Sequence, residues 1–396
     1  MEKVFSNQKN SGNDTLPVDN NNHTTSESPA ARAIAFYLPQ FHPIPENNKW
    51  WGAGFTEWTN VAKAKPLYRG HWQPRLPADL GFYDLRVPET RIAQAKMAKE
   101  SGIEAFCYWH YWFGNGRRIL DRPFKEVVES GQPDFPFCLA WANQSWSGIW
   151  HGNPKSVLIE QTYPGKEDEK AHFESMLPAF RDKRYMKIDG KLVFVVFNPS
   201  DLPNTESFLA HWQQLAKDAG LQGFYFIAMS NNYSHPNNAY YDAVTCNGPG
   251  NFLVTQQSLP CRILRRLKNR NFGKFINKLT NDWLKLPERY DYAYVVEQSL
   301  KSMPEDARYI PGIMPNWDNT PRSTKRGVVF ERSTPELFRK FLSEALKKVA
   351  TRPPQHRIVF VKAWNEWAEG NYIEPDAKYG WAYLDVIKSE IFPSRR

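Results

Sequence analysis

The chain alternates short apolar runs with stretches of helical spacing. Eight apolar runs are predicted to form strands, at residues 33–38, 103–109, 135–141, 192–197, 224–229, 242–246, 308–315 and 358–361. Helical patterns lie between them, and the clearest cover residues 88–101, 121–130, 166–182, 204–219 and 334–350. The runs are apolar throughout rather than at every second position, which is typical of parallel strands covered on both faces.

Eight such strand–helix units predict an α/β fold, a single (β/α)8 barrel of the TIM type with long loops after its strands. A doubly wound open sheet is the structural alternative. Against it, no Gly-x-Gly-x-x-Gly follows the first run, and no P-loop occurs. Residues 1–30 are polar and rich in Asn, Ser and Thr, so we expect a disordered tail before a barrel of residues 31–396.

Polar and aromatic residues follow the apolar runs directly. In a (β/α)8 barrel these positions lie at the C-terminal ends of the strands, where the active sites of this fold are built. The first run is followed by a loop of about 40 residues, far beyond the usual connection length, and such loops are commonly functional. We therefore expect the catalytic and binding residues at this end of the barrel.

The strongest candidates for catalysis are Glu366 and Glu369, which follow the eighth run. Residues three apart lie on one face if the chain turns helically there, with Cβ atoms about 5–6 Å apart. Mutual repulsion and partial burial raise the pKa of one carboxyl in such a pair and leave the other charged. Retaining glycosidases use carboxyls about 5–5.5 Å apart for acid/base chemistry on acetals. The alternative is two solvated glutamates on a loop.

Further candidates for substrate binding share this location. They are Glu57, Trp58, Asn60, Trp109, His110, Tyr111, Trp112, Trp141, Asn143, Trp146, Trp317, Asp318, Asn319, Arg322, Trp364, Asn365 and Trp367. Aromatic faces suit sugars, although core packing explains a tryptophan equally well. Glu57 fits a second carboxylate, a ligand of sugar hydroxyls or a loop cap. Arg322 fits a bidentate grip on an anionic group or an ion pair with Asp318.

Composition agrees with a carbohydrate site and narrows the chemistry. The chain holds 15 tryptophans, and 15% of its residues are aromatic. Its four cysteines have no CxxC spacing, and its nine histidines show no His-x-x-x-His pairing. No Gly-x-Ser-x-Gly is present. We therefore expect no metal, no cofactor, no disulfide framework and no serine or cysteine triad.

Positive charge is concentrated in one segment. Residues 261–279, inside a basic insertion at about 255–287, carry seven Lys/Arg and no acid, and without them the net charge of +9 falls to +2. This segment fits an amphipathic helix on anionic lipid, a contact to phosphate-bearing substrates or a solvated helix. No nucleic-acid module is recognisable. With no signal peptide and no long apolar stretch, we expect a cytoplasmic protein, with peripheral contact at the inner face of the membrane left open.

Five motifs in fixed order resemble a known family. They are FYLPQFHP at 36–43, GFTEWTNV at 54–61, WHYWF at 109–113, WDNTPR at 317–322 and WNEWAEG at 364–370. Over about residues 31–390 the chain resembles the WbsX-type family, described as glycosyltransferases of bacterial surface-polysaccharide biosynthesis. That family is similar in turn to glycoside hydrolase family 99, the endo-α-mannosidases.

The resemblance implies a (β/α)8 barrel with retaining, metal-independent chemistry. It also implies that Glu366 assists the attack of the substrate 2-hydroxyl and that Glu369 is the general acid/base. Ala368 departs from the pattern, because the mannosidases typically carry His there, and mannose specificity does not carry over.

Three functions stay open. The first is a glycosyltransferase of lipopolysaccharide O-antigen or capsule synthesis, acting on a glycan or lipid-linked oligosaccharide. The second is a family 99-like endo-acting hydrolase, favoured by the lack of an Asp-x-Asp motif. The third is a non-catalytic glycan-binding or membrane-associated scaffold.

Overall fold

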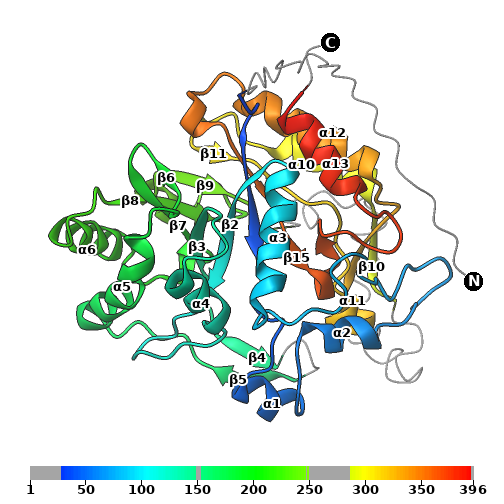
Figure 1. The fold of residues 1–396 in the computed structure, drawn as a ribbon, viewed down its shortest axis with the longest axis horizontal. Coiled ribbons are helices and arrows are strands. Elements are labelled where there is room, and N and C mark those ends of the chain that lie inside the picture. The colour runs from blue at the N-terminus through cyan, green and yellow to red at the C-terminus, as the bar shows by residue number, and fades with distance from the viewer. Residues whose placement is uncertain (1–27, 149–152, 247, 249–285, 394–396) are drawn as a thin grey trace, which may run out of the picture.

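The computed structural model describes residues 28–148, 153–246, 248 and 286–393. Most of the predicted tail and the whole basic segment 261–279 lie outside the described residues. The central feature is a barrel of parallel strands surrounded by helices (Figure 1). Its strands are β1 Arg32–Tyr37, β2 Ile103–His110, β3 Phe137–Trp141, β7 Lys191–Val196, β8 Phe224–Met229, β9 Ala243–Thr245, β11 Tyr309–Ile310, β12 Gly312–Ile313 and β14 Ile358–Val361.

The barrel closes through an interrupted seventh strand. β11 pairs with β9 and β12 pairs with β14, while only Pro311 separates β11 from β12. Proline has no N–H to give to a ladder, but its carbonyl accepts from the Phe360 N–H at 2.9 Å. β14 then pairs with β1. The predicted α/β barrel is therefore confirmed, and the irregular strand predicted at 308–315 is its seventh.

In the described part of the chain, seven longer α-helices cover the barrel: α3 Pro88–Glu100, α4 Arg122–Ser130, α5 Lys166–Phe180, α6 Thr205–Asp218, α10 Tyr292–Ser302, α12 Pro335–Val349 and α13 Ala382–Ile391. Local signals explain the best-defined ends. The Thr334 hydroxyl accepts from the Leu337 N–H at the start of α12, and Pro335 takes the first helical position. Gly131 closes α4 in the left-handed conformation. The predicted helices at 88–101, 121–130, 166–182, 204–219 and 334–350 are confirmed.

Shorter elements decorate the loops. They are α1 Pro45–Trp51, α2 Glu57–Lys63, α11 Thr320–Ser323, β4 Trp146–Gly148, β5 Asn153–Ile159, β6 Lys187–Ile188, β10 Glu288–Asp291, β13 Val328–Glu331, β15 Asn365–Glu366 and β16 Asn371–Tyr372, with 3-10 turns η2 Pro199–Asp201, η3 Pro236–Tyr240, η4 Thr324–Arg326, η5 Pro354–His356 and η6 Trp367–Glu369. The long first loop is thus not irregular throughout. In Figure 1, α1, α2, α11, β4 and β5 gather at the lower edge, toward which β1 points.

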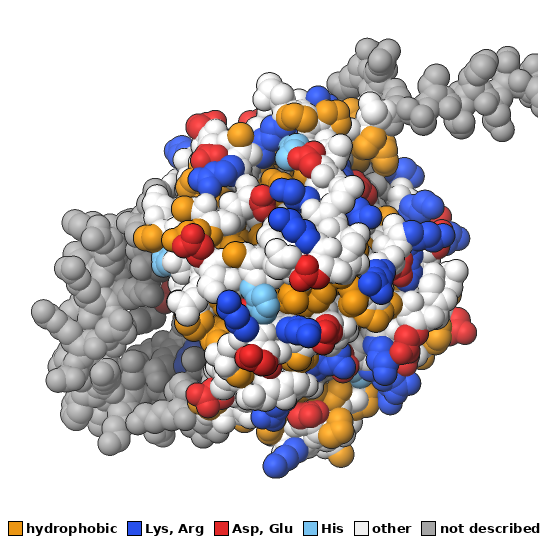
Figure 2. Space-filling view, turned by 90° about the vertical axis from the view of Figure 1, so that its left-hand side faces the viewer, with side chains coloured by type: hydrophobic (Ala, Val, Ile, Leu, Met, Phe, Trp, Pro, Cys, Tyr) orange, Lys and Arg blue, Asp and Glu red, His pale blue; other side chains and the backbone are white. Residues whose placement is uncertain are grey.

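Aromatic side chains fill the layer between the barrel and its helices. Trp212 of α6 has no exposed surface and packs against Phe194 of β7 and Phe224 of β8. Figure 2 shows the outer face on the α5 and α6 side, where acidic and basic side chains are interspersed. Apolar burial therefore stabilises this side from within, while its surface carries no large area of one charge.

Candidate active site

Four charged side chains meet at the C-terminal end of the barrel. Arg322 of α11 lies at the centre and contacts three carboxylates. Its Nε and Nη2 each lie 3.1 Å from Glu57 Oε2, and its Nη1 lies 2.6 Å from Glu369 Oε1. Its Nη2 lies 3.9 Å from Glu366 Oε2. We call these four residues the carboxylate–arginine cluster.

Strand order explains why residues so far apart in sequence meet. β1 and β14 are neighbours, with Ala35 opposite Val361, so the segments that follow them leave the barrel together. Asn365 extends this pairing, because its Oδ1 accepts from the Leu38 N–H at 2.7 Å and its Nδ2 donates to the Leu38 carbonyl at 3.0 Å. β12 lies on the other side of β14 and brings in Arg322. Strand order therefore brings Glu57 and Arg322 to Glu366 and Glu369.

The cluster is largely removed from water. The side chains of Glu57, Glu366, Glu369 and Arg322 are 3%, 8%, 10% and 12% exposed. Burial, and then the charge of Glu369, raise the pKa of Glu366 to about 7 despite Arg322. Burial opposes the charge of Arg322, but the carboxylates, Glu57 first, raise its pKa above the ordinary value. Near neutral pH the cluster can therefore gain or lose one proton.

Two aromatic side chains border the cluster. The Trp109 indole donates from Nε1 to Glu366 Oε1 at 3.0 Å, and its ring stacks on Phe36 with centroids 5.1 Å apart. Burial, and then the charge of Glu366, raise the pKa of Tyr111, so its hydroxyl stays neutral. The half-buried Trp146 meets Tyr111 edge-on at 5.4 Å. These groups form a partly apolar wall beside Glu366, as a sugar ring requires.

Lys362 also belongs to this region, and sequence reasoning missed it. It directly follows β14 and is 7% exposed. Its Nζ lies 5.8 Å from the centre of the Trp109 ring and 6.0 Å from that of Phe197. Its charge lowers the pKa of Glu366, although less than Arg322 does. The signal was present, because Lys362 occupies the strand end that singled out the other candidates.

Asp318 and Asn319 support the loop that carries Arg322. The fully buried Asp318 carboxylate accepts from Gln73 Nε2 at 2.8 Å and from the Thr320 hydroxyl at 2.6 Å, and His71 Nε2 lies 2.8 Å away. Asn319 Oδ1 accepts from the Val328 N–H at 2.8 Å. Both side chains are thus hydrogen-bonded within the protein. Arg322 pairs with the three glutamates and not with Asp318.

A second buried carboxylate, Glu374, supports the loop after β14, and it was also missed. It accepts from Trp367 Nε1 at 2.6 Å, from Gln94 Nε2 at 2.6 Å and from the Tyr83 hydroxyl at 2.9 Å. Burial raises its pKa to about 7. Trp58 donates to the Tyr83 carbonyl and lies 5.5 Å from Trp367. The contact between these tryptophans therefore connects the loop after β1 with the loop after β14.

The remaining tryptophan after β14, Trp364, is fully buried and packs against Phe106, with ring centres 5.1 Å apart. Asn60 of α2 is 2% exposed, and among the described residues its Oδ1 has no hydrogen-bond partner. Trp364 is therefore part of the core, whereas Asn60 retains an unused acceptor near Glu57.

Four other predicted residues lie apart from the cluster. His110 points outward from β2 and meets His172 of α5, with Nε2 atoms 2.7 Å apart. Burial lowers the pKa of His110 to about 3, so it stays neutral. Trp112 donates to Asp168 of α5. Two more residues pack between the strands and this helix side: Trp141, which donates to the Trp112 carbonyl, and Asn143, which bonds the Asn198 backbone.

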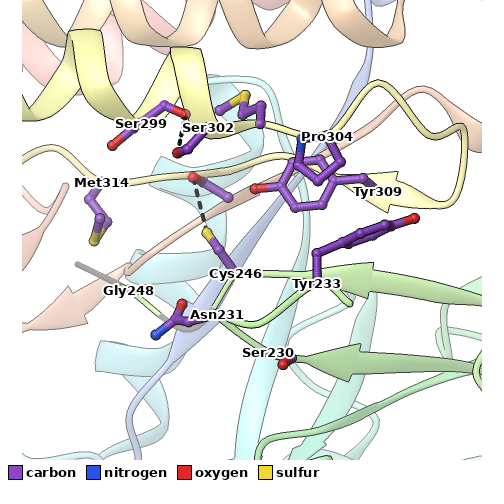
Figure 3. Close-up of a pocket in the computed structure, with 12 residues that line it drawn as sticks. Ser230, Asn231, Tyr233, Cys246, Gly248, Ser299, Ser302, Pro304, Tyr309 and Met314 are labelled. Carbon is purple, nitrogen blue, oxygen red and sulfur yellow. Dashed lines mark hydrogen bonds between the residues drawn. The ribbon is translucent and has the colours of Figure 1, made fainter. Parts of the chain in front are cut away.

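A cavity of about 110 Å³ lies beside the site, between β8, β9, β12 and α10 (Figure 3). Tyr233 and Tyr309 border one end of it, and Gly248 and Met314 the other. A Cβ on Gly248 would lie 3.6 Å from Lys362 Nζ and 3.9 Å from the Trp317 ring. Gly248, which borders the cavity, therefore lies next to Lys362 and Trp317.

Solved structures share this architecture. A glycoside hydrolase-like protein is 15% identical, with 96% of this chain and 98% of that chain covered and a TM-score of 0.56. The GH99 endo-alpha-mannosidase from Bacteroides thetaiotaomicron is 13% identical, with 91% of this chain and 96% of that chain covered and a TM-score of 0.52. At these identities the likeness concerns the fold.

The matching family is one of carbohydrate-active enzymes. The chain belongs to the family described as glycosyltransferase WbsX, whose model matches residues 33–387. It is also similar to the uncharacterized protein WxcX of Xanthomonas campestris pv. campestris, with 37% identity over 368 residues, which is 92% of this chain and 50% of that protein. The chain thus spans about half the length of this relative.

Proposed function

We propose that the chain transfers glycosyl groups in the synthesis of a bacterial surface polysaccharide, with Glu366 and Glu369 as the catalytic pair of a retaining mechanism. One observation carries this proposal: two buried carboxylates share one guanidinium beside an aromatic wall. Carboxyls that contact the same group lie close together, and retaining chemistry uses the short separation of about 5 Å. The family supports transfer as the outcome.

The remaining residues of the site fit substrate binding. Trp109, Tyr111 and Trp146 supply apolar faces and a neutral hydroxyl, and Asn60 supplies a buried acceptor. A lipid-linked glycan, with its reacting sugar placed over Glu366, is the substrate class that we propose. Contact of residues 261–279 with anionic membrane would bring such a substrate near, and this segment lies outside the described residues.

Hydrolysis is a second candidate, because the fold is shared with an endo-alpha-mannosidase. The two outcomes differ only in whether a sugar hydroxyl or water completes the reaction. To distinguish transfer from hydrolysis, the protein is incubated with lipid-linked glycan, with and without nucleotide sugars. The masses of the products are then measured by mass spectrometry. Growth that requires a nucleotide sugar supports transfer, whereas shortening without one supports hydrolysis.

Two variants decide whether the pair is catalytic. Glu366→Gln and Glu369→Gln keep the size of each side chain but remove its acid/base chemistry. Glu344→Gln, at an exposed ion pair on α12, is the matched control. Loss of product in the first two and not in the third supports the proposal. Unchanged glycan assembly in both cluster variants would instead favour a non-catalytic scaffold.

A further inference from the structure

The cavity in Figure 3 is lined by residues that directly follow three strands of the barrel. Ser230 comes directly after β8, Cys246 after β9 and Met314 after β12. In a (β/α)8 barrel these positions belong to the active-site face. The carboxylate–arginine cluster uses the loops after β1, β12 and β14, so the cavity occupies a further part of the same face. Its location is therefore that of a binding site.

Gly248 and Lys362 connect the cavity with the cluster. A Cβ on Gly248, which borders the cavity, would lie 3.6 Å from Lys362 Nζ. That nitrogen lies 5.8 Å from the centre of the Trp109 ring, and the Trp109 indole donates to Glu366 at 3.0 Å. When the reacting sugar of a glycan lies over Glu366, another unit of the same glycan is therefore within reach of the cavity.

The lining of the cavity is neutral. None of the described residues that line it is acidic or basic, and Lys362 lies next to Gly248 without belonging to the lining. Burial raises the pKa of Tyr233 and of Tyr309, so both hydroxyls keep their protons at neutral pH. A phosphate or carboxylate placed here would lose its hydration without gaining a cation from the lining. The cavity therefore disfavours anionic ligands.

The polar groups of the lining are mainly free to accept hydrogen bonds. The hydroxyls of Ser230 and Ser302 each donate to a backbone carbonyl, at 3.1 and 3.0 Å, and the Cys246 thiol donates to the Gly312 carbonyl at 3.4 Å (Figure 3). A hydroxyl has one proton but two lone pairs, so both oxygens can still accept. Ser299 is 8% exposed, and its Oγ has no hydrogen-bond partner among the described residues. A ligand that donates hydrogen bonds therefore suits the cavity.

The size of the cavity fits one sugar unit. One ordered water needs about 10–15 Å³ of such space, so a cavity of about 110 Å³ accommodates a ligand of roughly ten heavy atoms. The ring of Tyr309, which meets Tyr233 edge-on at 5.9 Å, and the side chain of Met314 supply apolar surface for the face of a sugar ring. Hydroxyl donors, an apolar face and the absence of charge together describe a neutral sugar.

We propose that this cavity is a second sugar subsite, which binds a neutral, hydroxyl-bearing unit of the glycan beside the reacting sugar. The assignment rests on the proposed function, because it takes the glycan as the ligand. The subsite has no part in breaking or forming bonds. It determines which glycans bind, since it accepts neutral sugars at this position and excludes uronic acids and phosphorylated sugars.

The Cys246 thiol reports whether the cavity is occupied. It is partly exposed, whereas Cys107 and Cys138 are buried and should stay unmodified in the folded chain. The full chain is treated with iodoacetamide, and peptide mass spectrometry measures the alkylation rate of Cys246. The added ligands are the methyl glycosides of glucose, galactose and mannose, each compared with the methyl glycoside of its own uronic acid.

At least one neutral glycoside should protect Cys246. A ligand at about ten times its Kd leaves a site open roughly one-eleventh of the time, so alkylation should slow about tenfold. The matching uronic acid should bind about 5- to 150-fold more weakly, because its carboxylate finds no partner. Absence of protection by all three neutral glycosides, or equal protection by the matching uronic acid, would overturn the proposal.

Ser302→Leu provides a second test by filling the rim of the cavity. Ser302 is exposed at the end of α10, so the fold should tolerate the change. Ser389→Leu on α13 is the matched control, because Ser389 is also exposed and its hydroxyl also donates to the carbonyl three residues earlier, at 3.0 Å. The glycoside concentration that half-protects Cys246 should rise about tenfold in Ser302→Leu. It should stay within about twofold in Ser389→Leu, and equal values in the two variants would contradict the subsite.

Binding is measured without turnover, so the two proposals can fail separately. A protein that binds a neutral glycoside in the cavity but acts on no glycan would overturn the proposed function and leave the binding result standing. Conversely, transfer to glycans without any protection of Cys246 would overturn only the subsite.

Discussion

The C-terminal ends of β14 and β2 carry similar sequences, but their side chains lie in different surroundings. Both apolar runs are followed by a mixture of tryptophan and polar residues. After β14 that mixture supplies two residues of the carboxylate–arginine cluster, whereas at β2 it divides between two faces. Trp109 points inward to Glu366, and its neighbour His110 points outward to His172. Successive residues of a strand face opposite sides, so position at a strand end is not enough, and facing decides which residues form the site.

The two strand ends should differ most in their effect on activity. Glu369→Gln and Glu366→Gln should each lower the rate of glycan transfer by about 10²–10⁴-fold, the usual size of an acid/base contribution. His110→Phe, on the outward face of β2, should leave the rate within about twofold. Product formation from lipid-linked glycan measures all three. A large loss in His110→Phe would show that the outward face takes part in the reaction.

Among these side chains, Arg322 should contribute most to the stability of the fold. Arg322→Met leaves three carboxylates without their shared cation, and removing one partner of a buried ion pair typically costs about 3–5 kcal/mol. Urea unfolding at pH 8 should show this loss, and the loss should shrink at pH 5.5 because protonation removes the repulsion. Arg339→Met, at an exposed pair with Glu390, should cost less than about 1 kcal/mol. Equal costs for the two variants would show that the buried cation is not needed.

The pH dependence of stability follows from Glu366 and Glu374. The pKa of each carboxyl is about 7 in the folded chain, against a reference value of 4.5. The folded state therefore binds more protons than the unfolded state between these values, and stability should fall as pH rises from 4.5 to 7. The fall should be on the order of 3 kcal/mol per group. Glu366→Gln and Glu374→Gln should each flatten the curve measured by urea unfolding, and an unchanged slope would contradict the burial argument.

The outward face should respond in stability alone. His110→Phe leaves the buried His172 nitrogen without its partner, which typically costs about 1–3 kcal/mol. Burial keeps the pKa of His110 at about 3 in the folded chain, so near pH 6 only the unfolded chain protonates this histidine. The loss in His110→Phe should therefore be slightly smaller at pH 6 than at pH 8. Thermal unfolding at the two pH values checks this. A cost that grows at lower pH would mean that the pair carries charge.

The smallest expected effect belongs to Lys362. Its charge lowers the pKa of Glu366, but its effect is smaller than those of burial, Glu369 and Arg322. Lys362→Met should therefore raise the titration midpoint of Glu366 by less than Arg322→Gln does. NMR spectra of the full chain with 13C-labelled glutamate carboxyl groups, recorded across pH 4–9, measure both shifts. A larger shift for Lys362→Met would make Lys362, rather than Arg322, the dominant cation of the site.

Sequence periodicity predicted the barrel because most of its strands are continuous apolar runs separated by helical patterns. Glu57 lies near Glu366 because the first and eighth strands of a closed barrel are neighbours. Facing was harder. Residues 109–112 offer four candidates in a row, and only the register of β2 against its neighbours assigns Trp109 to the interior.

Glu374 shows a second reason for misses. Its partners Tyr83 and Gln94 lie almost 300 residues away along the chain, so no local pattern marks it as buried. Asp318 was found as a polar residue at a strand end, but its neighbours His71 and Gln73 come from a distant loop and take up its carboxylate. Sequence spacing shows which polar groups follow the strands. Whether such a group is already hydrogen-bonded within the protein depends on contacts between loops.

The hydrogen bonds between Asn365 and Leu38 have a consequence for laboratory evolution. One amide side chain fastens the loops after β1 and β14, which together supply all three glutamates of the cluster. Libraries that vary Trp146 can explore new acceptors while this fastening stays intact, since Trp146 lies on β4, in the loop after β3. Libraries that vary Asn365 would loosen all three carboxylates of the cluster together, so selectable variants should retain it.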